Sequence, residues 1–427
     1  MKEFTEFFEK NQIKYIQFQF TNILGKFKIV EFPTSIWKDL KEGTGIDGSS
    51  LGFLTTEQSD MKIVPDTKSF AILPWNPKVG RFICDLYDNY DNPYPTCPRG
   101  ILRKVMSKAE SMDFQFKTRP ELEWYFLTQD LTPADKGSYM DTLPLDKFQD
   151  LRRQITDDIM SMNIGVKTIH HEFGLGQQEI EFIVNDALYQ ADNVQTAKLI
   201  TQTRAFYNDL ISTFIPKPFE EMAGNGLHIH QYLTKNGENV FTNSENKLSD
   251  ILYNYIGGIQ HHVNAITAIL NPTTNSYKRL TPHHEAPVYV SWGVGNRTAL
   301  IRVPGYENSA RIEYRAGDGM MNIYLGSAIL LAAGLDGIKK KMEPNLATSK
   351  NVDLLTNEER KELKIEKLPV SLEESLEAFE KSSFIKKTLG KDLTKVYLNL
   401  KYKELAEFEL AKSNGNEKEW EFNQYLF

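Results

Sequence analysis

The stretch Arg119-Pro-Glu-Leu-Glu-Trp-Tyr-Phe126 has the composition of an aromatic β-strand that carries two acidic side chains. Residues i and i+2 of a strand lie on the same face, so we expect Glu121 and Glu123 to point into one cavity. A second stretch, Arg311-Ile-Glu-Tyr-Arg315, alternates charged and apolar residues in the same way and places Glu313 between two arginines. Either strand alone is typical of a solvated surface, but two of them in one chain favour a shared site.

Two further stretches add ligands of the same kind. They are His170-His-Glu172, with Glu179 seven residues later, and Gly226-Leu-His228. Together the four stretches offer five carboxylates and, in His228, an imidazole beside several arginines. Oxygen-rich ligand sets suit hard cations such as Mg²⁺ or Mn²⁺, and arginines beside such cations are typical of bound phosphate or carboxylate. The combination predicts phosphoryl transfer.

The histidines raise the alternative of a zinc hydrolase, because all eight occur in four close groups, at positions 170/171, 228/230, 261/262 and 283/284. Adjacent residues of a helix point about 100° apart, so His261 and His262, in a predicted helix, cannot bind one metal together. His228 and His230 follow a Gly-Asn-Gly turn and can share a face. The chain has no His-Glu-x-x-His motif and no Gly-x-x-x-x-Gly-Lys-Ser/Thr loop. The zinc hydrolase is therefore the weaker hypothesis, and a P-loop enzyme is not expected.

The first hundred residues are predicted to form a small β-rich domain. Tyr15–Thr21 and Phe27–Phe32 alternate with the period of a strand. The segment Asp91-Asn-Pro-Tyr-Pro-Thr-Cys-Pro98 is dense in turn-forming residues and marks the end of this region. We therefore place one domain over residues 1–98 and a second over residues 99–427.

The second domain is predicted to alternate long helices with short strands. Near its end, Ser371 and Glu374 form the Ser-x-x-Glu pattern of a helix start, and Gly390 is expected to close the helix that follows. Lys339-Lys-Lys341 is predicted to be the solvated end of a helix. Further helical patterns cover residues 99–111, 192–214 and 248–270.

Bulk composition excludes several classes of protein. The 427 residues carry a net charge of −7, whereas proteins that bind nucleic acid usually have a basic face. Two cysteines, Cys84 and Cys97, cannot form a disulfide framework, which favours a reducing, cytoplasmic location. The amino terminus lacks the apolar core of a signal peptide. No window approaches about 18 uninterrupted apolar residues, so no membrane span is expected.

The order and spacing of several runs resemble class I glutamine synthetase, the ATP-dependent glutamate–ammonia ligase, across nearly the whole chain. The resemblance implies an α+β fold with a small N-terminal β-grasp-like domain and a larger C-terminal α/β catalytic domain containing a curved antiparallel sheet. It also implies that glutamate accepts phosphate from ATP to form γ-glutamyl phosphate, which ammonia converts to glutamine. The matching runs are Gly45-Ile-Asp-Gly-Ser-Ser-Leu51, Ser59-Asp-Met61, Pro216-Lys-Pro218, Asn275-Ser-Tyr-Lys-Arg-Leu280, Glu285-Ala-Pro-Val-Tyr289, Asn296-Arg297, Arg311-Ile-Glu-Tyr-Arg315 and Ala332-Ala-Gly-Leu-Asp-Gly-Ile338.

The resemblance also assigns roles to individual residues. Two or more divalent cations, Mg²⁺ or Mn²⁺, are implied at each active site. The ligands of the first cation are Glu123, Glu172 and Glu179, and those of the second are Glu121, His228 and Glu313. The substrate residues are Gly224, Arg279 and Arg315, the nucleotide residues are His230, Arg297 and Arg302, and the catalytic residues are Asp47, Glu285 and Arg297. The ammonium pocket is formed by Asp47, Ser50, Tyr139 and Glu172.

Assembly follows from the same resemblance. Asp47 and Ser50 are expected to come from a neighbouring subunit of a dodecamer made of two hexameric rings. The apolar, aromatic tail Lys418-Glu-Trp-Glu-Phe-Asn-Gln-Tyr-Leu-Phe427 resembles the carboxy-terminal strap that ties the two rings together. The expected partners are therefore glutamate, ammonium, ATP and further copies of this chain.

Departures from the family pattern lie around the amino-acid and nucleotide sites. Ala223 stands where the family has asparagine, Pro282-His-His-Glu285 replaces Pro-Gly-Tyr-Glu, and Tyr232 and Val184 occur near the nucleotide. These changes favour a γ-glutamyl ligase that uses a polyamine or another amine, whereas the retained ammonium pocket favours ammonia. A catalytically silent relative is the alternative from another class, but such a protein would not need every metal ligand.

Overall fold

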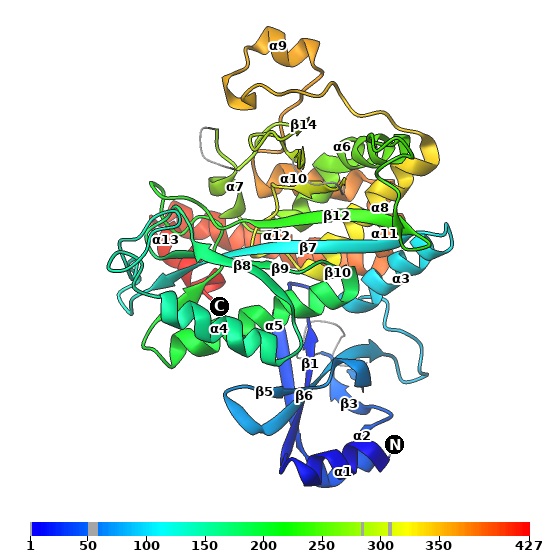
Figure 1. The fold of residues 1–427 in the computed structure, drawn as a ribbon, viewed down its shortest axis with the longest axis vertical. Helices are drawn as coiled ribbons and strands as arrows, with labels where there is room; N and C mark the ends of the chain where they lie inside the picture. The colour runs from blue at the N-terminus through cyan, green and yellow to red at the C-terminus, as the bar shows by residue number, and fades with distance from the viewer. Residues whose placement is uncertain (1, 50–58, 283–285, 306–309) are drawn as a thin grey trace.

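The computed structural model describes residues 2–49, 59–282, 286–305 and 310–427. A small β-rich unit lies at one end of the molecule, and a larger unit of sheet and helices occupies the rest (Figure 1). The last strand of the small unit ends at Tyr87, and the first helix of the larger unit begins at Pro98. The expected α+β class is confirmed.

The small unit is a six-stranded sheet in the order β2-β1-β6-β4-β3, with β5 paired to β6. β1 runs parallel to β6 and antiparallel to β2, and both strands predicted from the period-two pattern are present. Aromatic side chains fill the space between sheet and helices, where Trp37 stacks on Phe82 with ring centroids 5.0 Å apart. The elements are α1 (Lys2–Lys10), β1 (Tyr15–Thr21), β2 (Phe27–Pro33), α2 (Trp37–Leu40), β3 (Thr44–Asp47), β4 (Asp60–Pro65), β5 (Ala71–Leu73) and β6 (Asn76–Tyr87).

A ten-stranded sheet forms the centre of the larger unit. Its main order is β14-β15-β16-β12-β7-β9-β8, with β10 and β11 paired to β7 and β13 paired to β12. The sheet is antiparallel as expected, except that β14 and β15 run parallel. The strands are β7 (Gln115–Leu127), β8 (Val166–His171), β9 (Gln177–Phe182), β10 (Asn185–Asp186), β11 (Ile211–Thr213), β12 (Leu227–Lys235), β13 (Glu238–Asn239), β14 (Trp292–Val294), β15 (Ile301–Val303) and β16 (Ile312–Tyr314).

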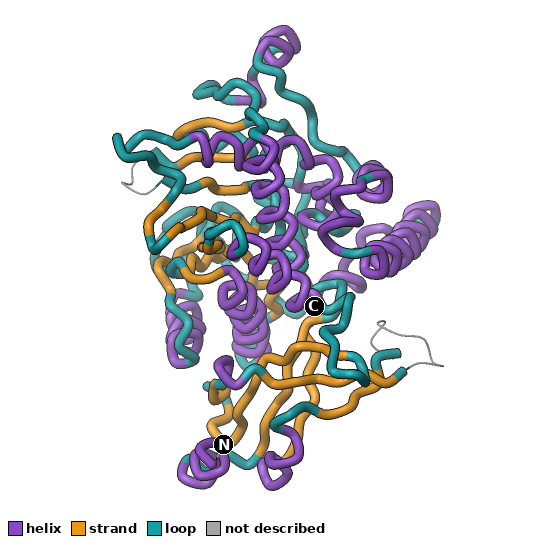
Figure 2. Tube along the Cα trace, turned by 90° about the vertical axis from the view of Figure 1, so that its right-hand side faces the viewer, coloured by secondary structure: helices purple, strands orange, loops and turns teal. Residues whose placement is uncertain are grey.

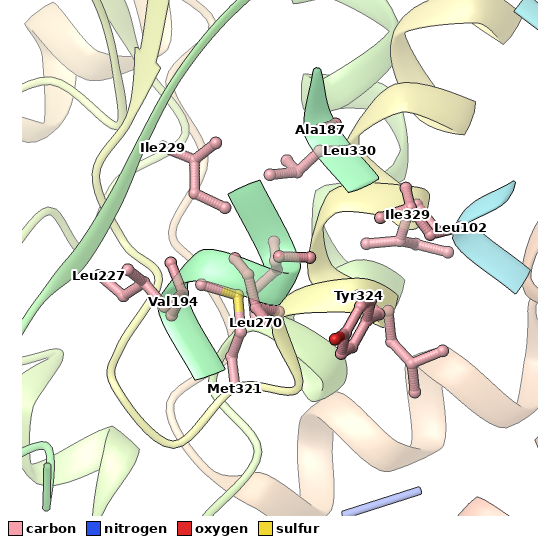
Figure 3. Close-up of a cluster of buried hydrophobic side chains, with 14 of the residues drawn as sticks. Leu102, Ala187, Val194, Leu227, Ile229, Leu270, Met321, Tyr324, Ile329 and Leu330 are labelled. Atoms are coloured by element: carbon pink, nitrogen blue, oxygen red, sulfur yellow. The ribbon is translucent and has the colours of Figure 1, made fainter. Parts of the chain in front are cut away.

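Most of the helices gather on one side of this sheet (Figure 2). Apolar residues of α5 and α8, among them Val194 and Ile329, pack with Leu227 and Ile229 of β12 in a fully buried core (Figure 3). This core leaves the polar face of the central strands free for a site. The helices are α3 (Pro98–Glu110), α4 (Gln149–Ser161), α5 (Ala187–Phe206), α6 (Asp250–Leu270), α7 (Ser276–Arg279), α8 (Ile323–Lys340), α9 (Asn357–Glu362), α10 (Leu372–Lys381), α11 (Ser383–Leu389), α12 (Lys391–Ser413) and α13 (Glu417–Tyr425).

Helices α6 and α8 cross at two glycines. A Cβ atom on Gly258 would lie 2.1 Å from the carbonyl oxygen of Ala333, and one on Gly337 would lie 2.1 Å from that of Asn254. Both distances are far below van der Waals contact, so the two backbones approach this closely only because neither residue has a side chain.

The structure corrects two helix boundaries. The helix expected over residues 192–214 ends at Phe206, because the chain turns through a left-handed residue, Asp209, and Ile211–Thr213 then pairs with β7 as β11. The helix expected to run from Ser371 to Gly390 is divided into α10 and α11. Ser382 divides it by capping a new first turn, since its side chain accepts a hydrogen bond from the Ile385 N–H.

The carboxy-terminal tail does not extend away from its own subunit. It forms α13, whose Phe422 and Tyr425 are buried in a cluster with Tyr125 and Leu127 of β7. Burial of these aromatic rings within one chain explains why the tail is apolar. The interpretation of this tail as a strap between rings stays a prediction.

Buried polar contacts join the two units. Arg99 of α3 forms ion pairs with Asp66 and Asp85 of the small unit, at 2.7 and 2.8 Å, and with Asp192 of α5, at 2.9 Å. Three carboxylates around one buried guanidinium compensate its loss of hydration, so α3 is held firmly against both units. Among the described residues, no helix is both long and apolar enough to cross a lipid bilayer.

Candidate active site

Four strands of the large sheet bring the acidic side chains together. Residues directly opposite each other on neighbouring strands share a face of the sheet, so the antiparallel register decides which side chains meet. The opposed pairs are Glu123 with Glu179, Glu121 with His228, and His230 with Glu313. The face predicted from the spacing in β7 is thus extended across β9, β12 and β16.

The first group of ligands lies at the ends of β8 and β9. His170 Nε2 is 3.1 Å from Glu172 Oε1 and 4.0 Å from Glu179 Oε2. Burial, together with the negative charges of Glu121 and Glu123, raises the pKa of Glu179 well above its usual range. Burial and the repulsion among these carboxylates thus both oppose the charged form of Glu179.

The second group lies between β7, β12 and β16. Glu121 is 3.2 Å from His228 Nδ1 and 2.7 Å from His230 Nε2, and His228 Nδ1 is 3.8 Å from Glu313 Oε1. Burial by itself would raise the pKa of Glu313, but the charges of Arg315, His230 and His228 together outweigh it and lower this pKa to about 2. Glu313 is therefore held as a carboxylate.

Both groups have the donor chemistry of a site for divalent cations. Within each group, one ligand atom from each of three side chains lies within 4.8 Å of the others. Carboxylates with an occasional imidazole suit Mg²⁺ or Mn²⁺, and a cation would relieve the repulsion that raises the pKa of Glu179. The groups are His170, Glu172 and Glu179, and Glu121, His230 and Glu313.

A third buried group with a similar composition has a structural role. His171 is hydrogen-bonded through Nε2 to Asp135, at 3.0 Å, and through Nδ1 to the carbonyl oxygen of Glu172, at 2.6 Å. The charge of Asp146 is compensated by Arg152, which forms an ion pair with it at 2.7 Å. This network fixes the end of β8 that carries Glu172.

The two ligand groups open into a cavity of about 880 Å³. Tyr139 stands at its mouth and stacks on Phe173, with ring centroids 4.8 Å apart. Both rings are partly exposed, at 39% and 51%, so they form a rim that is open to solvent. Of the residues predicted from sequence, the cavity is lined by Glu121, Glu123, Tyr139, Glu172, Glu179, His228, Arg297 and Arg315.

The predicted substrate residues Gly224 and Arg279 lie side by side. A Cβ atom on Gly224 would lie 2.8 Å from Arg279 Cγ and 2.5 Å from the carbonyl oxygen of Pro216, so the site accepts only glycine there. Arg279 Nη1 donates to the carbonyl oxygen of Ala316 at 2.7 Å. The guanidinium is therefore buried in a fixed position.

Comparison with known proteins agrees with this geometry. Residues 12–89 match the model of the glutamine synthetase beta-Grasp domain, and residues 95–425 match that of the glutamine synthetase catalytic domain. The chain belongs to the glutamine synthetase family. Together the two matches cover nearly all of the sequence, including every strand of the site.

Relatives of the family align with this chain from end to end. Glutamine synthetase of Thermotoga maritima is 40% identical over 433 residues, covering 98% of each chain. Glutamine synthetase of Pyrococcus furiosus is 42% identical over 431 residues, covering 98% of this chain and 97% of its own. Among solved structures, GmaS in complex with ADP has a TM-score of 0.90 at 29% identity, covering 99% of both chains.

Asp47 is expected in the glutamine synthetase site but does not line the cavity of this chain. Ser50 and Glu285 lie outside the described residues. Asp47 is described and lies exposed at the end of β3, where its carboxylate accepts from the Ser49 N–H at 2.9 Å. No described residue of the range 1–98 lines the cavity.

Sequence reasoning missed several residues of the cavity wall. Glu181 of β9 pairs with Arg119 at 2.8 Å and with Lys167 at 3.3 Å, and all three line the cavity. The signal was available, because Glu179 and Glu181 have the same i, i+2 spacing as the acids of β7. His170 is a further potential ligand that the sequence prediction did not include, although it lies two residues before the predicted ligand Glu172.

Proposed function

We propose that this protein joins ammonia to the γ-carboxylate of glutamate, using ATP and giving glutamine, ADP and phosphate. The observation that supports the proposal most is the strand register that brings Glu121, Glu123, Glu179 and His228 to one cavity flanked by arginines. The two relatives from Thermotoga maritima and Pyrococcus furiosus, which align with nearly the whole chain, are both named glutamine synthetase and so support the same activity. ADP bound to the structurally similar GmaS supports the nucleotide.

The first step forms an acyl phosphate. A γ-carboxylate oxygen of glutamate attacks the γ-phosphorus of ATP, and the bond from phosphorus to the ADP oxygen breaks. Bound divalent cations, two or more of Mg²⁺ or Mn²⁺, would neutralise charge on the transferring group, and the two ligand groups would hold them. Arg315 reaches the cavity wall beside Glu313, where its positive charge favours the same transition state.

The second step forms the amide. The nitrogen of ammonia attacks the acyl carbon, phosphate leaves with its electron pair, and the excess proton passes to a carboxylate. Glu172 and Tyr139 line the cavity and offer a negative charge and a hydroxyl for ammonium. Asp47 would join them from a neighbouring subunit, and the exposed rim formed by Tyr139 and Phe173 is where that subunit would approach.

A phosphate-release assay tests the proposal. The protein, ATP, Mg²⁺ and glutamate are combined with ammonium or with one member of a panel of alkylamines and polyamines, and the amide product is separated by chromatography. We expect phosphate release to depend on both glutamate and ammonium and to yield glutamine in equal amount. Faster turnover with one of the amines would replace ammonia by that amine, and no phosphate release with any acceptor would refute the proposed activity.

A further inference from the structure

Helix α13 packs against the two segments that carry Arg279 and Gly224, the residues predicted to bind glutamate. One segment, residues 275–279, ends in Arg279, and the other, residues 216–226, contains Gly224. The side chain of Glu421 in α13 is only 3% exposed. A carboxylate buried this deeply requires partners that compensate its lost hydration.

Asn275 joins the two segments. Its side-chain oxygen accepts from the Lys217 N–H at 2.7 Å, and its Nδ2 donates to the Lys217 carbonyl oxygen at 3.1 Å. The amide of one side chain thus pairs with the backbone of the other segment in both directions, which sets the distance between the segments.

Glu421 fixes the side-chain amide of Asn275. Its Oε2 accepts from Asn275 Nδ2 at 3.0 Å and from Lys278 Nζ at 2.9 Å. Asn275 directly precedes α7, and Lys278 lies next to Arg279 at its end. One carboxylate oxygen of α13 therefore contacts α7 at both of its ends. Charge-assisted hydrogen bonds of this kind are shorter and stronger than neutral ones.

The aromatic face of α13 reinforces the same region. Phe422 and Tyr425 pack with Tyr125, whose hydroxyl donates to the carbonyl oxygen of Ala223 at 2.7 Å. Tyr425 lies 3.3 Å from the hydroxyl of Thr274, next to Asn275. Both walls of the clamp are therefore supported by the last helix of the chain.

We propose that Glu421 is a positioning residue that sets the spacing between Arg279 and the Gly224 turn, and through it the affinity for the amino-acid substrate. The proposal rests on the proposed function and on the family resemblance, which implies that these two residues bind glutamate. Glu421 does not touch the substrate and acts only through Asn275 and Lys278. Displacement of a binding group by a fraction of an ångström weakens binding of the substrate that it contacts.

The test compares KM values for the three substrates in Glu421→Gln, which keeps an acceptor for Asn275 but removes the charge that pairs with Lys278. We expect KM for glutamate to rise about tenfold, while KM for ATP and for ammonium stays within about twofold. Lys278→Met should raise the glutamate KM similarly, and the double variant should be no worse than either single variant. Glu419→Gln, at an exposed position of the same helix, serves as the matched control and should leave all three values unchanged.

Three outcomes separate this inference from its alternatives. An unchanged glutamate KM in Glu421→Gln would overturn it, provided that the unmutated protein makes glutamine. A parallel rise in all three KM values, or a change of assembly mass in light scattering, would overturn it as well, because α13 would then act on folding or assembly. An unmutated protein without ligase activity would refute the proposed function and this inference with it.

Discussion

At the scale of single residues, Glu313 shows how neighbours decide the state of a buried acid. It is only 1% exposed, and burial alone would favour its neutral form. Arg315 is in contact with one of its oxygens, and Arg302 donates to the other at 2.6 Å. Glu313 is therefore both a candidate ligand for a cation and the partner of buried arginines, whereas Glu123 has its closest contact with the Gly226 N–H, at 2.6 Å.

Because Glu313 pairs with buried arginines and Glu123 does not, substitutions of these two residues should differ in their effect on stability. We expect Glu123→Ala and Glu313→Ala each to lower phosphate release by more than about a hundredfold, since even partners outside a ligand set contribute tenfold to a hundredfold. Glu313→Ala should also destabilise the fold by about 3–5 kcal/mol, because the buried charge of Arg315 loses its carboxylate. Activity assays and urea unfolding measure the two effects, and most of the activity remaining in either variant would contradict the site assignment.

Ala223 offers a prediction about the substrate pocket. Its carbonyl is fixed by Tyr125, and Gly224 beside it packs on Arg279, but its methyl group has no donor or acceptor. A missing hydrogen bond to a charged substrate group is worth roughly 1.5–3 kcal/mol. We expect Ala223→Asn to tighten glutamate binding about tenfold to a hundredfold in calorimetric titration. Micromolar affinity in the unmutated protein, or no gain in the variant, would show that another group fills this role.

At the scale of elements, close helix contact depends on residues without side chains. α6 and α8 approach through Gly258 and Gly337, and each glycine faces the backbone of the other helix. The core in Figure 3 is built on this pair, because α8 carries Ile329 and Leu330 against the sheet. A shift of α8 would therefore move the layer that supports the strands of the site.

Gly258→Ala tests this contact. We expect the free energy of unfolding to fall by about 1–3 kcal/mol, although alanine favours a helix by up to about 1 kcal/mol, because the new Cβ would overlap the carbonyl oxygen of Ala333. Gly45→Ala is the matched control, since a Cβ there meets nothing within 4 Å. Equal unfolding midpoints in urea for Gly258→Ala and the unmutated protein would show that α6 and α8 can move apart to accommodate the methyl group without loss of stability.

At the scale of the whole molecule, the small unit is attached to the larger unit, and its described residues do not reach the cavity of the same chain. Arg99 binds acids of both units, which restricts movement between them. Asp47 is exposed and lies on the small unit, while none of the described residues of that unit lines the cavity. A site that uses Asp47 therefore needs a second subunit.

Subunit mixing tests this arrangement together with assembly. We expect light scattering to give twelve times the 49.1 kDa subunit mass. Asp47→Ala and Glu123→Ala, each inactive alone, should recover activity when refolded together, because some interfaces then combine two intact halves. Glu123→Ala mixed with Glu172→Ala is the control and should stay inactive. A homogeneous active monomer would exclude a shared site.

The sequence by itself determined the acidic faces of β7 and β16, the first two strands of the small unit and the family. Strand period is a local property, so Glu121 and Glu123 were placed on one face without knowledge of their neighbours. The helix expected over residues 248–270, which the structure begins at Asp250, followed from local periodicity in the same way. His262 Nε2 lies 2.8 Å from a carboxylate oxygen of Asp336.

Only the tertiary structure decided which faces meet and what supports them. The register that places Glu179 opposite Glu123, and the ion pairs that bring Glu181 into the cavity wall, join residues far apart in the chain. The end of α5 and the docking of α13 also depend on long-range partners, β7 above all. Local patterns report how a segment satisfies its own backbone, but strand register and helix docking are set by packing energies that arise only when distant segments come together.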